Sequence, residues 1–560
     1  MPTYKTPNVY IEEVATLPPS VVPVATAVPA FLGCTEKAGN NHEYRHQPIR
    51  ISSLLDYTTY FGGAQATPFA VTLDATEQIT QIQAGNGTTV TPEYLMYYAV
   101  RLFFDNGGGA CYILSVGDYS KKPDKKAFED GLTALSKEDE PTLILLTDAV
   151  NLQNSVDYYD LCQKVLNQCN KLKDRFAILD VLASDKSASQ GIGAAFKSGV
   201  TQNLKYGAAY YPYLQTSLGY HYTDESIRVT GLTSSVTTPS APVGEYLIGG
   251  TDGLRVTYNG PQSENPRVRV TVTDRSSIAV EADNGVLTIR LPQAGATVAQ
   301  ILVGNATVGK YRLAASGVTT TPINAALAET ALTYPSASTS DSSPLTSIKT
   351  AKTELYNKIK LALNAMRVVM PPSPAVAGVY ATVDRERGVW KAPANMSLAS
   401  VIGPTIKITN EEQENLNVDP TAGKSINAIR SFTGKGTLIW GARTLAGNDN
   451  EWRYISVRRL FNLIEESIQK ATNFVVFESN NAVTWLKVKT IAETYLDGLW
   501  RQGALAGATQ QEAFFVSVGL GQTMAEQDIL EGRMIIEIGV SAVRPAEFII
   551  LRFSHKLQQG

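Results

Sequence analysis

The pattern of apolar and polar positions changes character along the chain, and each change predicts a different kind of structure. From about residue 21 to 216, short apolar runs alternate with segments of helical period. Residues 142–147 and 175–180 are two such runs, bounded by proline or charged residues. Between them, apolar side chains recur at helical spacing, namely at Tyr158, Leu161, Cys162, Val165 and Leu166. Strands that alternate with helices are typical of an α/β layer, which we predict here.

The stretch from 217 to 348 is rich in Thr, Ser, Val and Gly. Residues 268–273 and 285–291 alternate strictly between apolar and polar side chains, as half-buried strands do. We therefore predict a β-rich insertion. It ends in a polar segment of small residues, 334–344, that is typical of a loop or linker.

After residue 349 the helical period returns, whereas both ends of the chain have the alternating or apolar pattern of strands. Three helices are predicted: one over Leu355, Ile359, Leu363 and Met366, a clearer one over Val457, Leu460, Phe461, Ile464 and Ile468, and a third after the candidate N-caps Asn480 and Asn481. Residues 533–538 and 547–553 predict strands, the second after Pro545. At the other end, Val9 and Ile11 alternate with Tyr10 and Glu12 before two prolines, which predicts one short strand.

Length sets the number of domains, because single hydrophobic cores stop growing at about 250–300 residues and this chain has 560. Its 44% apolar and 18% charged residues are ordinary for a packed globular protein. We predict an α/β (α+β) multi-domain fold in five parts: an N-terminal arm (1–20), the first part of an α/β domain (21–216), the β-rich insertion (217–348), an α/β core (349–532), and a C-terminal strand and arm (533–560).

Charge and cysteine content exclude several classes of protein. A net charge of −3 and an isoelectric point near 6.0 argue against a dedicated nucleic-acid binder. The four cysteines form no C-x-x-C pair, so we expect buried free thiols in a reducing compartment. The start of the chain lacks the pattern of a secretory signal, and the apolar stretch 21–34 is short and broken by prolines, so we expect no membrane anchor.

One motif suggests catalysis: His42, Glu43 and His46 form an H-E-x-x-H, in which two histidines one helical turn apart bind zinc and the glutamate activates water. The motif needs a stable helix, yet Gly39 precedes it, Pro48 follows it, and almost no apolar residue lies between. A polar loop is the better prediction, and a zinc metallopeptidase is the remote alternative.

Residues 421–425 end like a phosphate-binding loop, but Val418 stands where its first glycine should be. No catalytic residue, metal or cofactor is predicted.

Four arginines cluster in the last quarter of the chain, namely Arg443, Arg453, Arg458 and Arg459. They could pair with acidic neighbours such as Glu465 and Glu466 or across subunits, form a solvated face, or form a basic patch for nucleic acid. The acidic net charge favours pairing.

Both predicted terminal strands are extended and apolar, and proline separates each of them from the rest of the chain. An unpaired strand is normally an aggregation hazard. It becomes useful if it adds to a sheet in an adjacent copy, since strand addition uses main-chain hydrogen bonds for affinity.

Several ordered segments carry a family resemblance: 434–445 (GKGTLIWGARTL), 452–459 (WRYISVRR), 544–552 (RPAEFIILR), 371–380 and 384–395 upstream, and 6–13 and 26–33 near the start. They resemble contractile tail sheath proteins of bacteriophage tails and of phage-tail-like injection systems. The resemblance implies a structural protein rather than an enzyme, with a sheath core of mixed sheet and helices. It leaves open whether the particle is a bacteriophage tail or a bacterial extracellular injection system.

The same resemblance implies how the subunit works. Copies would stack in helical rings around an inner tube and contract to drive the tube through a target envelope. The partners would be other copies, the inner tube, the baseplate and a terminator or cap protein, without nucleic acid or a membrane anchor. The particle would be assembled in the bacterial cytoplasm. The arm contacts between subunits would be made by Thr6, Pro7, Val9, Tyr10, Ile11, Glu12, Phe548, Ile550, Leu551 and Phe553, with interface charges at the four arginines.

Overall fold

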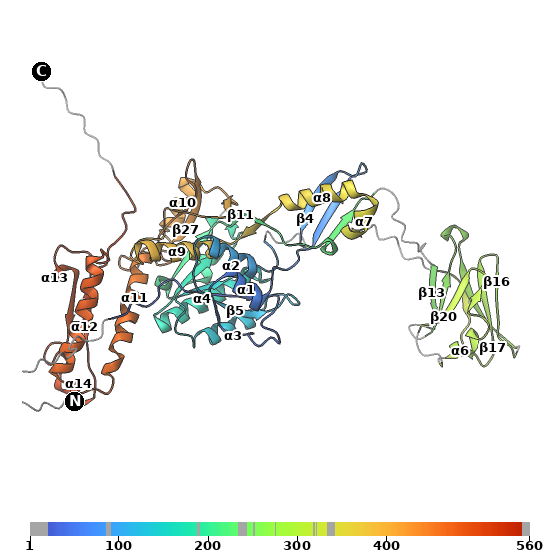
Figure 1. Cartoon of the computed structure of the whole chain (residues 1–560). Helices are drawn as coiled ribbons and strands as arrows, with labels where there is room; N and C mark the ends of the chain where they lie inside the picture. Colours follow the sequence, from blue (N-terminus) through green and yellow to red (C-terminus); the bar gives the residue numbers. More distant parts are fainter. Residues whose placement is uncertain are drawn as a thin grey trace, which may run out of the picture. The chain divides into compact units, whose positions relative to one another are not determined.

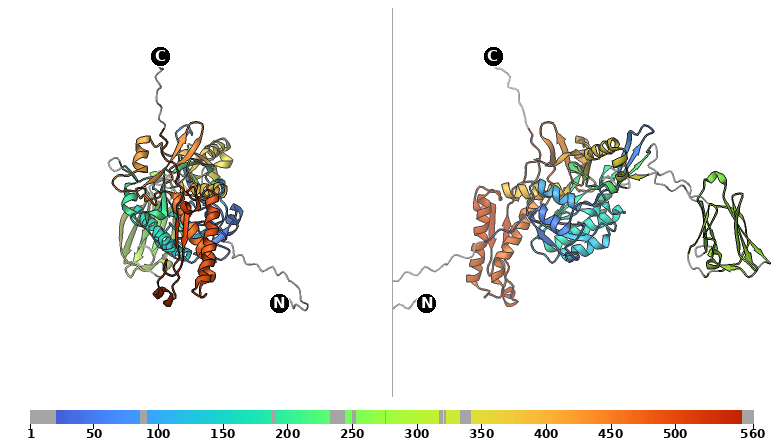
Figure 2. Two further views of the ribbon diagram at one scale, coloured as in Figure 1. Left: turned by 90° about the vertical axis from the view of Figure 1, so that its left-hand side faces the viewer. Right: turned by 45° about the vertical axis from the view of Figure 1, so that its right-hand side comes forward.

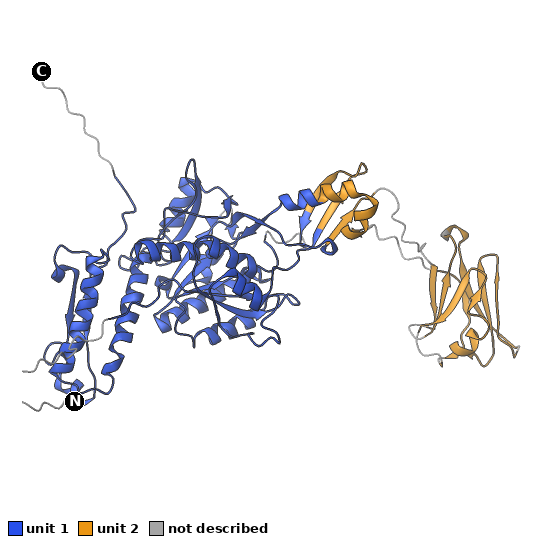
Figure 3. Cartoon of the chain, in the orientation of Figure 1, with its two compact units in different colours: residues 1–69, 83–226, 360–560 blue, residues 70–82, 227–359 orange. Residues whose placement is uncertain are grey.

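The computed structural model describes residues 21–85, 91–187, 191–232, 244–249, 253–274, 276–316, 320, 322–332 and 342–550. The chain divides into two compact units (Figure 3). Unit 1 comprises Met1–Phe69, Gln83–Ser226 and Lys360–Gly560, and unit 2 comprises Ala70–Ile82 and Ile227–Ile359. The predicted N-terminal arm, 1–20, lies outside the described residues.

Unit 1 is built on a nine-stranded mixed sheet in the order β2-β5-β1-β6-β7-β10-β27-β28-β25. The strands from β5 to β27 run parallel, and β2, β28 and β25 join antiparallel at the two edges. Every residue of β1, β6, β7 and β10 is buried, as expected for parallel strands covered on both faces. The strands are β1 Pro29–Cys34, β2 Ile49–Ile51, β5 Cys111–Gly117, β6 Leu143–Leu146, β7 Phe176–Asp180, β10 Gly207–Tyr211, β25 Met396–Ser397, β27 Ile426–Phe432 and β28 Gly436–Trp440.

Helices pack on this sheet in two groups (Figure 1). Helices α2 and α9 contact each other and the strands β1, β6 and β7, whereas α3 and α4 contact each other and the strands β5 and β7. The helices around the sheet are α1 Leu54–Phe61, α2 Met96–Asp105, α3 Lys125–Leu135, α4 Ser155–Leu172, α5 Ala194–Gly199, α9 Ser373–Arg387 and α10 Asn410–Asn417. A small antiparallel sheet, β24 Arg367–Met370, β11 Leu214–Gly219 and β26 Val401–Pro404, completes this part. The predicted α/β layer is confirmed, with α4 between β6 and β7.

The end of unit 1 is a helical hairpin with a small sheet. Helices α11 Ile455–Thr472 and α12 Ala482–Arg501 lie side by side in both views (Figures 1 and 2). Helix α12 begins where the sequence predicts, because the Asn481 side chain accepts hydrogen bonds from the amides of Val483 and Thr484, each at 3.1 Å. The remaining elements are α13 Gln510–Ala513, β29 Phe514–Ser517, α14 Glu526–Leu530 and β30 Glu537–Val540.

Unit 2 contains a four-stranded sheet and a separate β-rich body. The sheet has the order β23-β12-β3-β4, and its elements are β3 Phe69–Leu73, β4 Ile79–Ala84, β12 Ile227–Thr230 and β23 Ser343–Pro344, with α7 Leu345–Ala351 and α8 Thr353–Ala365 following β23. Strands β3 and β4 come from a stretch that the sequence pattern assigns to the α/β layer. Strand β3 pairs with β12, about 150 residues later, and β4 pairs with β3, which explains why the bounds of unit 2 differ from the predicted 217–348.

The β-rich body has two four-stranded sheets around a core of its own. One has the order β13-β14-β20-β19, with β13 Gly244–Ile248, β14 Leu254–Tyr258, β20 Tyr311–Ala315 and β19 Thr307–Val308. The other has the order β16-β17-β15-β22, with β16 Ala279–Asp283, β17 Val286–Pro292, β15 Arg267–Thr273 and β22 Leu327–Ala331. A two-stranded sheet, β18 Ala296–Thr297 and β21 Pro322–Ile323, and helix α6 Val298–Leu302 complete it. The two predicted alternating segments are β15 and β17.

The predicted strands at the chain end differ from the structure. Strand β30 covers Glu537–Val540, whereas residues 533–536 are not in a strand. Residues 547–550 of the second predicted strand, 547–553, are not in a strand either, and 551–553 lie outside the described residues. A strand needs a hydrogen-bonding partner, and 547–550 have none along their backbone in this subunit as far as the structure describes it.

Candidate inter-subunit surface

A small open sheet lies at the end of unit 1. Strands β29 and β30 pair antiparallel from Phe514↔Val540 to Ser517↔Glu537. Phe514 and Val516 are buried against the helical hairpin, while Phe515 on the other face is 53% exposed. Among the described residues no third strand extends this sheet. A two-stranded sheet is marginal in water on its own. One face of this sheet is packed, and residues 541–543, which continue β30, bond to the backbone of residues 504–506. Along β29 and β30 themselves the described residues leave the outer strand edges unpaired.

A groove of about 760 Å³ runs beside this sheet. Its apolar lining comes from helix α11 and both strands, with Val457, Phe461, Phe514, Phe515 and Val540. Glu512 and Arg544 add charge to it. Unpaired strand edges next to an apolar groove are suited to an added extended segment, since main-chain bonds supply affinity and alternate side chains fill pockets.

The last described residues are apolar and exposed. Phe548, Ile549 and Ile550 are 70%, 80% and 78% exposed. Phe548 and Ile550 are two of the predicted arm residues, and the structure gives them no apolar packing partner of the kind that buries such side chains in a core. The other predicted arm residues, namely Thr6, Pro7, Val9, Tyr10, Ile11, Glu12, Leu551 and Phe553, lie outside the described residues.

The exposed tail is tied to its own subunit one residue earlier, at Glu547. The side chain of Arg443, only 4% exposed, donates from Nε to Oε1 at 3.0 Å and from Nη2 to Oε2 at 2.7 Å. Asn417 Nδ2 donates to Oε1 at 2.7 Å and the Tyr454 hydroxyl donates to Oε2 at 3.2 Å. Burial raises the pKa of Glu547, but Arg443, Asn417 and Tyr454 together outweigh burial and hold the pKa below its ordinary value.

The first described residues are tied to the same part of unit 1. Arg459 forms an ion pair with Asp384 at 2.5 Å and donates to the backbone carbonyl of Thr26 at 2.7 Å. Both charged side chains are almost fully buried, at 3% and 6% exposure. The amide of Val24 donates to Ser467 Oγ at 3.2 Å. The first and the last described segments of the chain are therefore each held by a buried arginine, Arg459 and Arg443.

The two remaining predicted arginines have different surroundings. Arg458 is 2% exposed; its guanidinium lies 4.4 Å from the centre of the Trp452 ring and pairs with Glu465 at 2.9 Å. Arg453 is partly exposed and donates to the carbonyl of Asp449 at 3.2 Å. Three of the four guanidinium groups thus form ion pairs with carboxylates of the same chain. Sequence reasoning anticipated Glu465, whereas it missed Glu547 and Asp384, which are 104 and 75 residues from their arginines.

The H-E-x-x-H segment is not helical. His42 and His46 have φ angles of 59° and 57°, in the left-handed region, and the segment consists of turns and an isolated bridge. Arg45 within it pairs with Asp118 at 2.6 Å. The helix that would place both histidines on one zinc ion is missing, so the metallopeptidase alternative is wrong for this segment.

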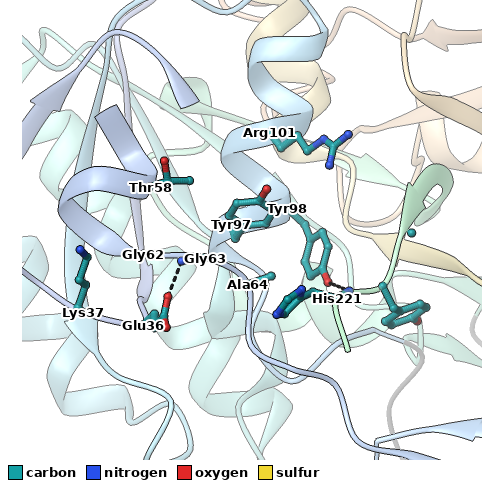
Figure 4. Close-up of a pocket in the computed structure, with 12 residues that line it drawn as sticks. Glu36, Lys37, Thr58, Gly62, Gly63, Ala64, Tyr97, Tyr98, Arg101 and His221 are labelled. Carbon is teal, nitrogen blue, oxygen red and sulfur yellow. Dashed lines mark hydrogen bonds between the residues drawn. The ribbon is translucent and has the colours of Figure 1, made fainter. Parts of the chain in front are cut away.

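Another hollow of about 760 Å³ lies in unit 1 near the start of α2 (Figure 4). Its polar groups hold neighbouring loops together. The Glu36 carboxylate accepts from the amide of Gly63 at 2.5 Å, and the Tyr98 hydroxyl accepts from the amide of His221 at 2.8 Å. Lys37 and Arg101 lie at opposite ends of the hollow. This arrangement supports the loops and offers no paired acid and base.

The part of the chain that the structure describes contains no group of three or more His, Cys, Asp or Glu side chains that could hold a metal ion. None of the helices found there combines the length and apolarity that crossing a bilayer requires.

Comparison with known families gives two matches. A family model described as the phage tail sheath protein central domain matches residues 278–445, and one described as the phage tail sheath C-terminal domain matches residues 447–556. The second match contains the open sheet, the helical hairpin and the exposed tail.

Individual proteins agree with this result. The tail sheath protein of Enterobacteria phage T4 is 28% identical over 129 residues, which are 23% of this chain and 19% of that protein. The anti-feeding prophage helical sheath in its contracted state is similar with a TM-score of 0.54 and 27% identity, covering 99% of this chain and 100% of that one. The PVC sheath of an extracellular contractile injection system, also contracted, gives a TM-score of 0.53 and 25% identity over 100% and 99% of the two chains.

Proposed function

This chain belongs to the phage tail sheath family, and from that premise we propose that it is the subunit of a contractile sheath, a structural protein rather than an enzyme. Copies polymerise in helical rings around an inner tube, and the polymer contracts to drive the tube through a target cell envelope. The partners are other copies of this chain, the tube, the baseplate, and a terminator or cap protein.

The observation that carries the proposal is the open β29–β30 sheet together with the exposed apolar tail. The sheet offers unpaired strand edges beside an apolar groove. The tail offers three consecutive exposed apolar residues, Phe548, Ile549 and Ile550. The tail needs a strand partner and the sheet needs a third strand. Because the tail is anchored in its own subunit at Glu547, we propose that it pairs with the sheet of a neighbouring copy. The N-terminal segment, 6–12, serves as the second arm.

Strand addition is strong enough to hold such a polymer together. Each main-chain hydrogen bond contributes about 0.5–1.5 kcal/mol net, so an arm that forms several contributes a few kcal/mol before its apolar side chains are counted. A contact that joins one surface of a subunit to a different surface of the next does not close on itself and generates a helix. Contraction then requires two such lattices of different free energy, with the arms intact in both.

Electron microscopy of the purified full-length protein tests the proposal. We expect striated hollow tubes, alone or after co-expression with a tube protein. Deletion of 1–20 or of 548–560 should leave a folded subunit that forms no tubes. The second deletion begins at Phe548 so that Arg443 keeps its partner. Normal tubes from both truncated chains would reject the arm mechanism, and monomers under every condition would reject the sheath function.

Within this function, we propose that the particle is an extracellular contractile injection system rather than a bacteriophage tail. The support is that two injection-system sheaths are similar to nearly all of this chain over nearly all of theirs, at 25% and 27% identity. Particles isolated from the producing cells decide between them: tails without heads support the injection system, and tails joined to DNA-filled heads support the phage.

A further inference from the structure

The ion pair between Arg443 and Glu547 lies directly before the exposed tail, residues 548–550. Glu547 is followed at once by Phe548, which is 70% exposed. Four donor atoms converge on its carboxylate from three parts of the chain: Asn417 at the end of α10, Arg443 after β28, and Tyr454 just before α11. A side chain held from three elements cannot shift with any one of them.

The same arginine holds other parts of unit 1 in place. Its Nη1 donates to the backbone carbonyls of Asn417 at 3.3 Å and of Gly447 at 3.1 Å. Arg443 is therefore held by contacts that do not involve the tail, and its planar fork meets the carboxylate with two parallel bonds, an orientation that a lysine could not impose.

We infer that Arg443, Asn417 and Tyr454 form a clamp on Glu547 that fixes where, and in which direction, the C-terminal arm leaves its own subunit. The inference rests on the proposed function and assigns positioning roles within it. A fixed exit point shortens the free length of the arm to the residues after 547. Shorter tethers raise the effective concentration of the arm at the neighbouring sheet and restrict the positions that the neighbour can take.

The chain offers a matched control. Glu140 accepts from Arg50 Nε at 3.2 Å and from the Tyr112 hydroxyl at 2.5 Å, which is the same combination of an arginine and a tyrosine on one carboxylate. It lies in the α/β layer and is far in sequence from the tail. Arg50 and Glu140 are 52% and 40% exposed, so a Glu140→Ala variant removes the same combination of partners at a more exposed site without touching the exit of the arm.

The first readout needs no assembly. The four native cysteines are buried, so a spin label attached to Ala546→Cys is selective. In the full-length chain we expect a slow, immobilised spectrum. Glu547→Ala should abolish the immobilised component, Glu547→Gln should reduce it, and Glu140→Ala should leave it unchanged. Removing the carboxylate leaves Arg443 buried without its counter-charge, so the double variant Arg443→Met with Glu547→Ala, which removes both charges, is measured beside it.

The second readout is sheath formation by the same variants. We expect loss of long regular tubes for Glu547→Ala and for the double variant, and normal tubes for Glu140→Ala. An immobilised label in folded Glu547→Ala and in the double variant would overturn the clamp. A mobile label combined with normal tubes would overturn its role in positioning. If the unaltered chain forms no tubes at all, the sheath function fails, and the label still decides whether the clamp exists.

Discussion

At the scale of single residues, two buried carboxylates occupy part of the carboxyl edge of the parallel sheet. Ligands commonly bind at this edge of an open α/β sheet. Here Asp180, the last residue of β7, accepts from the amide of Ser373 at 2.8 Å and from its hydroxyl at 2.5 Å. Asp148, just after β6, accepts from the amides of Cys34 and Leu95. Both carboxylates join strand ends to neighbouring segments and so occupy part of the edge.

These carboxylates predict a pH dependence of stability. Burial raises the pKa of Asp180 from 3.8 to about 7. Because the pKa is higher in the folded state, the protonated Asp180 carboxyl stabilises the fold. This stabilisation is fully present below pH 3.8 and is lost as the pH rises through about 7. We expect that raising the pH from 5 to 8 lowers the free energy of unfolding by about 2–3 kcal/mol through the ionisation of Asp180. Asp180→Asn should remove this contribution, measured as the midpoint of chemical unfolding across that range.

Asp148 titrates in the same window, because burial raises its pKa to about 7 as well. The free energy of unfolding of the Asp180→Asn variant should therefore fall with pH about half as steeply as that of the unaltered chain. A second change, at Asp148, should remove most of the remaining pH dependence. Asp157, exposed on α4 and paired with Lys125, is the control. An unchanged slope in Asp180→Asn, or an equal change in Asp157→Asn, would contradict the prediction.

At the scale of elements, the contact between α2 and α9 depends on a glycine. A Cβ at Gly378 of α9 would lie 2.5 Å from the carbonyl oxygen of Phe103 and 2.7 Å from Cβ of Asn106, both on or next to α2. Backbone cannot move aside as a flexible side chain can. Gly378→Ala should separate the helices and lower the free energy of unfolding by about 1–3 kcal/mol, measured by denaturant unfolding.

The control for this prediction is Gly498 in α12, where a new Cβ would meet no atom within 4 Å. There alanine should stabilise the helix by up to about 1 kcal/mol, because glycine is a poor helix former. Opposite signs for the two substitutions indicate close packing at Gly378. Equal signs would mean that helix propensity, not packing, decides both.

The sequence predicts elements well where the signal is local. Helix α4 and strands β6 and β7 follow from sequence patterns over 4–18 residues. The sequence pattern does not assign β3 and β4 to the second unit, because β4 pairs with β3 and the other partner of β3, β12, lies about 150 residues later; periodicity carries no pairing information. The same limit applies to the inter-subunit surface: the sequence predicts Phe548 and Ile550 as arm residues, which stays a prediction, whereas the Glu547 contact with Arg443 depends on the fold.

At the scale of the whole molecule, the β-rich body of unit 2 is separable from the rest. Its sheets bury a hydrophobic cluster of their own, which includes Val256, Val268, Leu287 and Tyr311 and is distinct from the main cluster around the nine-stranded sheet. A body with its own core does not depend on the remaining chain for burial of apolar surface. Sheath subunits can therefore carry such an insertion without a change in the core.

Excision of this body is the sharpest test of that independence. Strands β12 and β23, which flank it in sequence, are antiparallel neighbours with Val229 opposite Ser343. In this register residue 230 faces residue 342, so residues 231–341 can be replaced by a two-residue Asn-Gly turn, the loop that such a pair favours. We expect the shortened chain to unfold at the same denaturant midpoint as unit 1 in the full chain and to form tubes of the same helical repeat. We expect the separate segment 244–332 to fold alone with one cooperative transition. A shortened chain that aggregates, combined with an unfolded segment, would mean that the two cores stabilise each other and that the insertion is part of the sheath framework.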